Sequence, residues 1–176
     1  MAGNSTVRVF IALWPREGTR TALFSLAQDW RTHCGGRITR RENLHLTLAF
    51  IGDVRADRIA SLSDIVSATR IASCDFEIDA AGYFRHHRVA WAGPAKMPAA
   101  LPAVVADLRG RLRVADFRCD ERPFVAHVTL LRDARCAPAP VISPAIALRS
   151  AEVVLALSEP TAAGVKYRVI ARAGGT

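Results

Sequence analysis

The chain has none of the segments that mark disordered, secreted or membrane-spanning proteins. Its 176 residues contain no low-complexity tract and no apolar run near the roughly 20 residues that a membrane span requires. The N-terminus has no basic flank leading into a long apolar stretch, so no secretory signal peptide is predicted. With 51% hydrophobic and 23% charged residues, the composition predicts a packed core in one domain, residues 1–176. We expect a cytoplasmic monomer with no membrane partner.

Cysteine pairs at metal-ligand spacing are also missing. No Cys-x-x-Cys occurs, and the four cysteines are widely and irregularly spaced: Cys34, Cys74, Cys119 and Cys136. A zinc site is therefore not predicted, and no cofactor is implied. Without a secretion signal, free cytosolic thiols are expected, and a disulfide framework is the alternative.

Lysine is nearly absent, because Lys96 and Lys166 are the only lysines. Arginine supplies the rest of the 24 basic residues, which exceed the 16 acidic ones and give a formal net charge of +8. Such an excess favours a polyanionic partner, with nucleic acid first, and the planar guanidinium group suits phosphate recognition. A GC-rich genome is the alternative explanation for the arginine content.

Apolar periodicity predicts a mixed α+β chain. Alternating or continuous apolar runs bounded by glycine and proline indicate strands, and apolar residues three and four apart indicate amphipathic helices. Helices are predicted at 19–32, 55–69 and 99–113. Strands are predicted at 7–13, 37–39, 45–51, 75–83, 89–92, 125–131, 152–157 and 166–171, with a proline-rich connection over 137–144.

Two His-x-Thr triplets carry most of the chemistry in this sequence. Each lies within a short apolar run: His45-Leu-Thr47 and His127-Val-Thr129. Because side chains of a strand alternate between its faces, each histidine shares a face with its threonine. In the first triplet Leu46, Leu48 and Phe50 are expected to point into the core. Two imidazoles on opposite sides of one reacting atom make an acid/base pair, and the hydroxyl groups can stabilise an oxyanion.

The two triplets belong to an internal echo. The order strand, helix, His-x-Thr strand occurs at 7–13, 19–32 and 45–50, and again at 89–92, 99–113 and 127–131. Repeated supersecondary units can be related by a pseudo-twofold axis. Such an axis would bring the two histidine strands face to face across a cleft.

With these blocks in view, the chain resembles the 2H phosphoesterase superfamily, and within it the RNA 2′,3′-cyclic phosphodiesterases once named 2′-5′ RNA ligases. The resemblance covers nearly the whole chain: 8–15 (RVFIALWP), 41–52 (RENLHLTLAFIG), 88–93 (RVAWAG) and 122–130 (RPFVAHVTL). It implies a bilobal α+β fold, with two pseudo-twofold-related lobes of antiparallel sheet and flanking helices around a central cleft. It also implies metal-independent hydrolysis of RNA or nucleotide 2′,3′-cyclic phosphates to 2′-phosphates.

By analogy with these relatives, His127 is expected to activate water and His45 to protonate the departing 3′ oxygen. The reversed assignment stays open, because the pseudo-symmetry makes the two histidines hard to tell apart. Thr47 and Thr129 are expected to donate hydrogen bonds to non-bridging phosphate oxygens. The alternative for a strand histidine is a structural, partly buried side chain.

Three further residues are candidates for substrate binding: Arg132, Arg41 and Phe10. Strict alternation puts Arg132 on the face of Leu130, away from His127, so Arg132 reaches a phosphate only if the strand has ended or bulged before it. A solvated arginine is the alternative for Arg132 and for Arg41. Phe10 can stack on a nucleobase, with core packing as its alternative.

The expected partners are RNA ends or cyclic nucleotides. Two other functions remain open: an RNA-binding module whose site no longer turns over, and a ligase that joins 2′-5′ RNA ends by the reverse reaction. The histidine and threonine at all four motif positions favour the hydrolase over the binding module.

Overall fold

The predicted periodicities correspond to regular elements in the computed structural model, which describes residues 5–70, 74–162 and 164–174. The helices are α1 (Glu17–Cys34), α2 (Ile59–Ser67) and α3 (Ala100–Val114), with short 3₁₀ turns η1 (Arg41–Asn43), η2 (Ala56–Arg58) and η3 (Arg85–His87). The strands are β1 (Thr6–Trp14), β2 (Arg37–Ile38), β3 (Leu46–Arg55), β4 (Phe76–Phe84), β5 (Val89–Gly93), β6 (Val128–Arg132), β7 (Val141–Leu148), β8 (Glu152–Thr161) and β9 (Gly164–Arg172). The chain is therefore α+β, as predicted.

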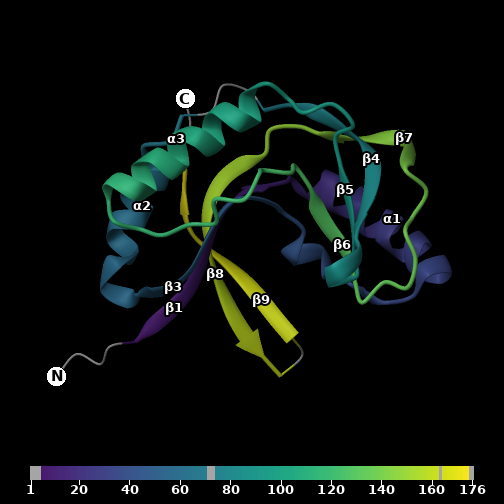
Figure 1. Cartoon of the computed structure of the whole chain (residues 1–176), viewed down its shortest axis with the longest axis horizontal. Coiled ribbons are helices and arrows are strands. Elements are labelled where there is room, and N and C mark those ends of the chain that lie inside the picture. Colours follow the sequence, from purple (N-terminus) through teal and green to yellow (C-terminus); the bar gives the residue numbers. More distant parts are fainter. Residues whose placement is uncertain (1–4, 71–73, 163, 175–176) are drawn as a thin grey trace.

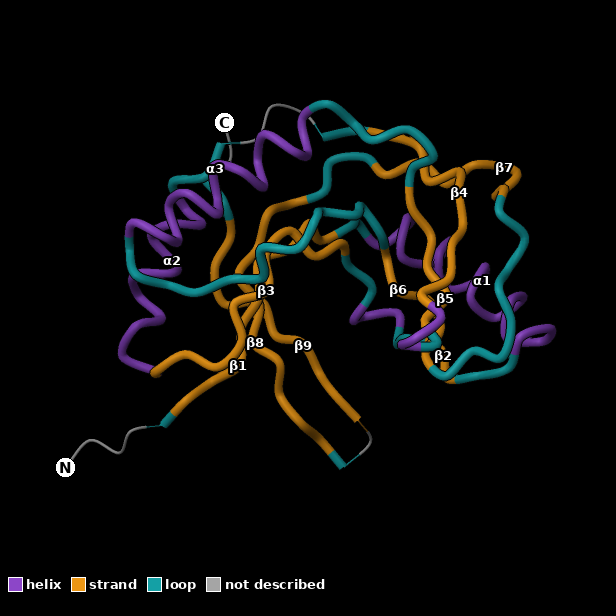
Figure 2. The backbone as a smooth tube through the Cα atoms, in the orientation of Figure 1, coloured by secondary structure: helices purple, strands orange, loops and turns teal. Residues whose placement is uncertain are grey.

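The strands form one antiparallel sheet in the order β7-β4-β5-β6-β3-β1-β8-β9, and β2 pairs with β6 beside this path. The order reads as two sets of four strands, β3-β1-β8-β9 and β6-β5-β4-β7, that meet where β3 lies beside β6. We call these sets the β3 half and the β6 half; they lie on the left and right of Figure 2. Each half begins with the strand that carries a motif threonine, followed by the first strand of its repeat unit. The predicted strands 45–51 and 125–131 begin later than expected, so His45 and His127 lie directly before β3 and β6. This strand order matches the internal echo of the sequence.

The helices cross over between the halves. Helix α1, which follows β1, packs against β2, β6 and β7, whereas α3, which follows β5, packs against β3 and α2. Figure 1 shows α1 beside the β6 half, and α2 and α3 beside the β3 half. Each long helix therefore covers the other unit's strands, which ties the two halves together.

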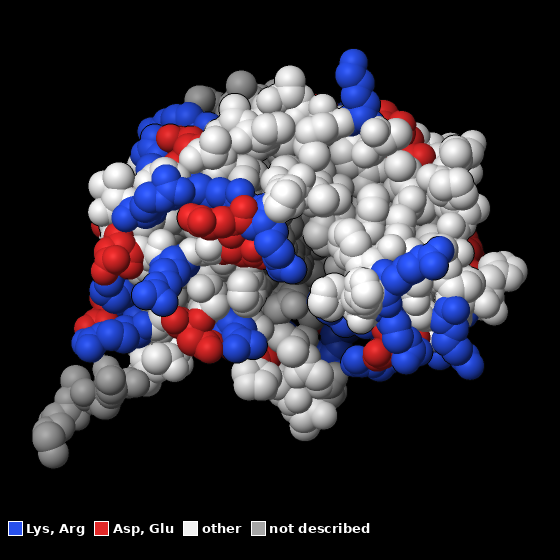
Figure 3. All heavy atoms as spheres, viewed as in Figure 1, with Lys and Arg blue, Asp and Glu red and all other residues white. Residues whose placement is uncertain are grey.

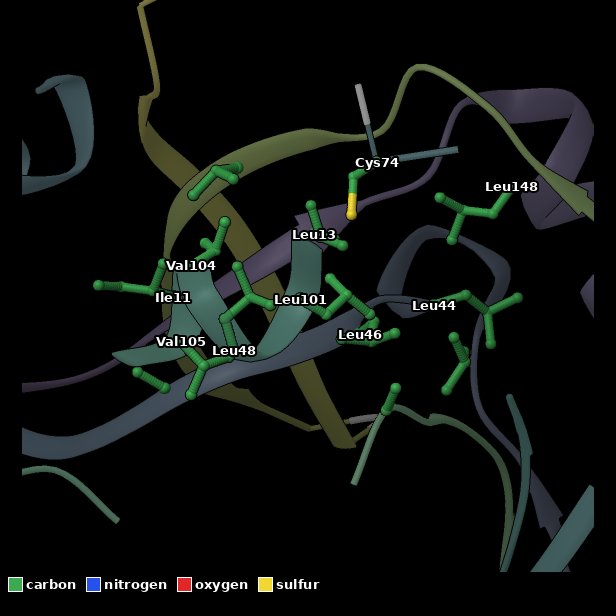
Figure 4. Close-up of a cluster of buried hydrophobic side chains, with 14 of the residues drawn as sticks. Ile11, Leu13, Leu44, Leu46, Leu48, Cys74, Leu101, Val104, Val105 and Leu148 are labelled. Carbon is green, nitrogen blue, oxygen red and sulfur yellow. The ribbon is translucent and has the colours of Figure 1, made fainter. Parts of the chain in front are cut away.

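A continuous apolar core lies between helices and sheet. Leu101, Val104 and Val105 of α3 point toward Ile11 of β1 and Leu48 of β3, and all five are at most 9% exposed (Figure 4). Burial of an aliphatic side chain contributes about 1.5–3 kcal/mol relative to leaving it exposed. The core therefore fixes β3, and with it the position of the first motif.

Strand β7 is not predicted by the sequence pattern. The predicted proline-rich connection covers 137–144, but β7 begins at Val141 and runs to Leu148. β7 is the terminal strand of the β6 half and pairs only with β4 among the described strands. Proline lacks the N–H that a central strand needs, and an edge strand tolerates it. Pro144 therefore concealed a strand that is possible only at the sheet edge.

The prediction that Phe50 points into the core is wrong. In the pairing with β1, Ile11 lies opposite Ala49 and Ala12 lies opposite Thr47, so Leu48 is an extra residue in β3. Beyond this bulge the faces exchange: Ala49 is 2% exposed, and Phe50 is 45% exposed. Strict alternation fails here because an extra residue exchanges the faces of the side chains directly after it.

The expectation of four free cysteines is also wrong for one pair. Cys34, at the C-terminal end of α1, forms a disulfide with Cys136, which follows β6. Cys74 and Cys119 are free, as predicted. The two bonded cysteines are 102 residues apart. The sequence did not show that they meet, because the crossover of α1 onto the β6 half is a tertiary feature.

Candidate active site

The two motifs meet at the seam between the halves. β3 and β6 pair antiparallel at one position, Leu46 opposite Val128, and both of these side chains are fully buried. Residues on either side of this pair point to the opposite face, and antiparallel direction sets His45 beside Thr129 and Thr47 beside His127. The four motif residues thus occupy the corners of one patch on one face of the sheet. Figure 3 shows a hollow in the molecular surface over the region where Figure 2 places the facing parts of β3 and β6.

Hydrogen bonds orient the His45 ring. Its Nδ1 lies 2.7 Å from the carbonyl oxygen of Asn43, which can only accept, so Nδ1 carries a proton. In the neutral ring Nε2 is then an acceptor, and the Thr47 hydroxyl donates to it at 3.1 Å. The tautomer is therefore set by the backbone two residues upstream.

Asn43 is a candidate positioning residue that was not predicted from the sequence. Its side chain is 5% exposed and bridges to β9: Nδ2 donates to the Val165 carbonyl oxygen at 2.7 Å, and Oδ1 accepts from the Tyr167 amide at 3.1 Å. A buried amide with both ends satisfied holds its backbone rigidly. Asn43 thereby fixes the carbonyl group that orients His45. The sequence signal that could have identified Asn43 is its position two residues before His45.

Aromatic rings enclose His45. Trp14 stacks on it with ring centroids 5.6 Å apart, Phe10 lies at 4.7 Å, and Tyr167 approaches edge-on at 5.1 Å. Burial among these rings lowers the pKa of His45 to about 4, because the charged imidazolium loses its hydration. The bond to the Asn43 carbonyl oxygen opposes this shift, and His127 and Arg132 add to it. At neutral pH the His45 ring is uncharged.

His127 repeats this arrangement on the other half. Its Nδ1 donates to the carbonyl oxygen of Val125 at 2.8 Å, again two residues upstream. Phe84 and Trp91 lie against the ring, with centroids 5.1 and 6.1 Å away. Burial lowers its pKa, and the charge of Arg132 lowers it further. Among the described residues no side chain bonds to Nε2 of His127, so this nitrogen faces the cleft with a lone pair.

A bulge also turns Arg132 toward the site. In the pairing with β5, Thr129 lies opposite Trp91 and Leu131 opposite Ala90, which makes Leu130 an extra residue in β6. Beyond it Leu131 is buried, and Arg132 returns to the face of Thr129. The guanidinium group lies close enough to lower the pKa of both histidines. Arg132 was expected to reach a phosphate only if the strand had ended or bulged before it, and the structure shows a bulge.

The other two candidates lie in different surroundings. Phe10 is 3% exposed, and its ring packs on His45 and Tyr167, which positions the His45 ring. Arg41 lies in η1 and forms an ion pair with Glu17 in the first turn of α1 at 3.0 Å. A direct contact of either residue with a substrate stays a prediction.

Metal ligands are not gathered in the described part of the chain. Within residues 5–70, 74–162 and 164–174, no group of three His, Cys, Asp or Glu side chains could hold an ion. Nor does any described helix have the length and apolar character needed to cross a membrane.

Comparison with known proteins gives consistent matches. A family model described as LigT like Phosphoesterase matches residues 13–91. An RNA 2′,3′-cyclic phosphodiesterase of Methanothermobacter thermautotrophicus is 32% identical over 72% of this chain and 71% of its own length. The Escherichia coli RNA 2′,3′-cyclic phosphodiesterase is 38% identical over 60% of this chain, and the match spans 62% of that protein. The crystal structure of E. coli LigT complexed with 3′-AMP superposes with a TM-score of 0.83 at 28% identity, covering 96% of this chain and 97% of that one.

Proposed function

This chain belongs to the LigT-like phosphoesterase family, and we propose that it hydrolyses the 2′,3′-cyclic phosphate of RNA ends or nucleotides to a 2′-phosphate. The observation that best supports this proposal is that His45 and His127 lie on one face of the seam, each with Nδ1 hydrogen-bonded to a backbone carbonyl oxygen. This arrangement aims both Nε2 atoms into the same space. The names of the relatives and the nucleotide bound to E. coli LigT support the same substrate class.

His127 acts as the base. Its Nε2 lone pair is uncommitted among the described residues, and its lowered pKa keeps it neutral at pH 7. It removes a proton from a water molecule as the water oxygen bonds to phosphorus. The bond from phosphorus to the 3′ oxygen breaks, and the phosphate stays on the 2′ oxygen.

His45 acts as the acid, and its ring takes up a proton from solvent when the substrate binds. In the empty cleft its pKa is about 4, too low for an acid at neutral pH. A phosphate anion beside the ring favours the imidazolium form and raises this pKa. The Nε2 proton then passes to the departing 3′ oxygen. The reaction thus consumes one water and leaves a 3′ hydroxyl group.

Thr47, Thr129 and Arg132 hold the non-bridging oxygens. The hydroxyl groups lie on the same face as the histidines, and the charge of Arg132 reaches both rings. Donors that are already oriented stabilise developing charge without reorganisation. Trp14, Phe84 and Trp91 supply the apolar walls that keep the site poorly hydrated.

The test is to incubate the purified protein with cytidine 2′,3′-cyclic phosphate in EDTA and to assign the product by ³¹P NMR. The expected product is the 2′-phosphate, formed at a rate that the chelator leaves unchanged and that follows a bell-shaped pH profile. That profile reports the coupled pair of histidines. Tight RNA binding without turnover would instead support the RNA-binding module. Loss of activity in EDTA with recovery on adding a divalent ion would overturn the two-histidine mechanism.

A further inference from the structure

A group of arginines lies at the corner of the β6 half where β2, β6 and the β4–β5 turn meet. Arg37 lies opposite Arg132 in the pairing of β2 with β6, and Arg88 follows η3. One carboxylate, Asp133, serves all three, because Arg37, Arg88 and Arg132 each lower its pKa, Arg37 most through its hydrogen bond. We call Arg37, Arg88, Arg132 and Asp133 the arginine corner. Three cations around a single anion leave net positive charge.

The pairing of Arg37 with Arg132 is unfavourable by itself. Like charges directly opposite each other on antiparallel strands destabilise the pair. Asp133 accepts from Arg37 at 2.8–2.9 Å and compensates one guanidinium group. The side chains are open to solvent: Arg37 is 75% exposed and Asp133 is 51% exposed. The corner therefore has both the charge and the access to bind a second anion.

The backbone of the corner is held in place from several sides. Arg88 and Asp133 both adopt the left-handed conformation, with φ of 53° and 55°, which is uncommon for residues other than glycine. Arg88 donates to the Asp133 carbonyl oxygen at 3.2 Å, and its own carbonyl oxygen accepts from the Ala134 amide at 2.9 Å. Strained backbone of this kind persists when its surroundings hold it, and it concentrates at ligand sites.

Two further links fasten the corner to α1 and β4. The Arg135 amide donates to the Cys34 carbonyl oxygen at 2.8 Å, next to the Cys34–Cys136 disulfide. The Tyr83 hydroxyl group donates to the Ala134 carbonyl oxygen at 2.7 Å. These bonds hold the backbone directly after Arg132 and Asp133, so the strand end that carries both side chains is fixed before an anion binds.

The charge pattern of the surface agrees with a local anion site. Figure 3 shows basic side chains with little acidic surface between them at the lower right, over the region where Figure 2 places β2 and β5. On the opposite side of the hollow, basic and acidic side chains alternate. On this face of the molecule, the basic side chains with the fewest acidic neighbours therefore lie over the β6 half.

We propose that the arginine corner binds the phosphodiester on the 5′ side of the terminal cyclic nucleotide. Arg132 belongs to both sites, so the positive charge continues from the cyclic phosphate to the next phosphate of the same strand. A cyclic mononucleotide has no such phosphate and leaves the corner empty. This inference rests on the proposed function and adds a second phosphate contact beside the same site.

The experiment compares kcat/KM for cytidine 2′,3′-cyclic phosphate with that for a dinucleotide ending in the same cyclic phosphate. We expect the dinucleotide to be hydrolysed about 10-fold more efficiently, since one charge-assisted contact contributes about 1.5 kcal/mol. Turnover of the mononucleotide tests the proposed function, and the ratio of the two substrates tests the corner. Binding of a dinucleotide that ends in a 2′-phosphate is measured in parallel, so an inactive preparation still tests the subsite.

Variants that remove a positive charge and a variant that removes a negative charge are expected to change the dinucleotide rate in opposite directions. Arg37→Gln and Arg88→Asn remove one guanidinium group each, and asparagine suits the left-handed position of Arg88. Both are expected to lower kcat/KM for the dinucleotide about 3- to 10-fold with the mononucleotide unchanged, within the range of partly exposed charge contacts. Asp133→Asn removes the competing carboxylate and is expected to raise the dinucleotide value.

Arg111→Gln is the matched control, because Arg111 is an exposed arginine paired with Asp107 on α3. It changes the net charge by the same amount as Arg37→Gln. An equal loss with Arg111→Gln would show a general effect of charge and overturn the proposal. So would equal losses for both substrates with Arg37→Gln and Arg88→Asn, or equal use of both substrates by the unaltered protein.

Discussion

Phe50 and Arg132 occupy equivalent positions in the two halves of the molecule. Each follows its motif threonine by three residues, and in each strand one extra residue, Leu48 or Leu130, turns it onto the face of the histidine. Both repeat units therefore contain the bulge, but the side chain that follows it differs: Phe50 in one and Arg132 in the other. One half presents an exposed ring to the cleft face and the other presents a guanidinium group, so the pseudo-symmetric scaffold carries an asymmetric site.

Replacement of either motif histidine is expected to reduce turnover strongly. His45→Asn and His127→Asn should each lower kcat by at least about 10², the lower end of what general acid/base catalysis contributes. Steady-state rates on the cyclic mononucleotide measure this, with circular dichroism to confirm folding. A folded variant with near-normal turnover would remove that histidine from the mechanism.

The threonines are expected to matter less than the histidines. Thr47→Val and Thr129→Val each delete one neutral donor while proton transfer remains, so losses of about 10-fold are expected, below the 10²–10³ of a full oxyanion donor. Thr47→Val also frees Nε2 of His45 and should shift the pH profile, whereas Thr129→Val should not. Serine at either position restores the hydroxyl group and serves as the control. Unchanged rates in both valine variants would refute the proposed contact with phosphate.

Stability is expected to fall in acid because of His45. Its pKa is about 4 in the folded chain and about 6.5 when unfolded, so the unfolded state binds the proton first as pH falls. As the pH falls from 6.5 to 4, the lowered pKa of His45 reduces the free energy of unfolding by at most about 3 kcal/mol. Urea unfolding of the unaltered protein and of His45→Asn at pH 7 and pH 4.5 measures it. The variant should lose less stability than the unaltered protein, and identical losses would contradict the lowered pKa.

Removal of the disulfide is expected to destabilise the fold. The bond closes a segment of about a hundred residues, for which chain entropy predicts roughly 3–5 kcal/mol. The double variant Cys34→Ala/Cys136→Ala should therefore unfold at lower urea concentration than the unaltered protein. A reductant should lower the unfolding midpoint of the unaltered protein but not that of the double variant. Cys119→Ala, which removes a free thiol, is the control. A reductant that leaves the unaltered protein unchanged would mean that the bond is absent in solution.

Two glycines are expected to respond to alanine in opposite directions. Gly36 has φ of +86°, and a Cβ there would lie 2.5 Å from the Arg132 carbonyl oxygen. Gly36→Ala should lower the free energy of unfolding and impair activity, because β2 can no longer pair closely beside Arg132. Gly110 lies in α3 with open space around it, so Gly110→Ala should stabilise by about 0.5–1 kcal/mol. Thermal melts check both, and tolerance of Gly36→Ala would contradict the close approach.

Much of the fold was predictable because it depends on local rules. The predicted helices at 19–32 and 99–113 correspond to α1 and α3, since apolar spacing and the Gly35–Gly36 stop are local signals. The echo of strand, helix and His-x-Thr strand anticipated the mirrored strand order. The cytoplasmic location, the monomeric state and the single domain stay predictions.

The sequence by itself determined which residues can perform the chemistry. Two histidines, each followed two residues later by threonine within an apolar run, need only the period of a strand to share a face. Tertiary structure decided what lies around them: the aromatic rings that lower the pKa of His45, the Asn43 bridge to β9 and the pairing of Cys34 with Cys136. These depend on contacts between segments far apart in the chain. Bulges decided the rest, because the extra residues Leu48 in β3 and Leu130 in β6 exchange the faces of the side chains directly after them. Alternation read along the sequence does not show where such a residue is inserted.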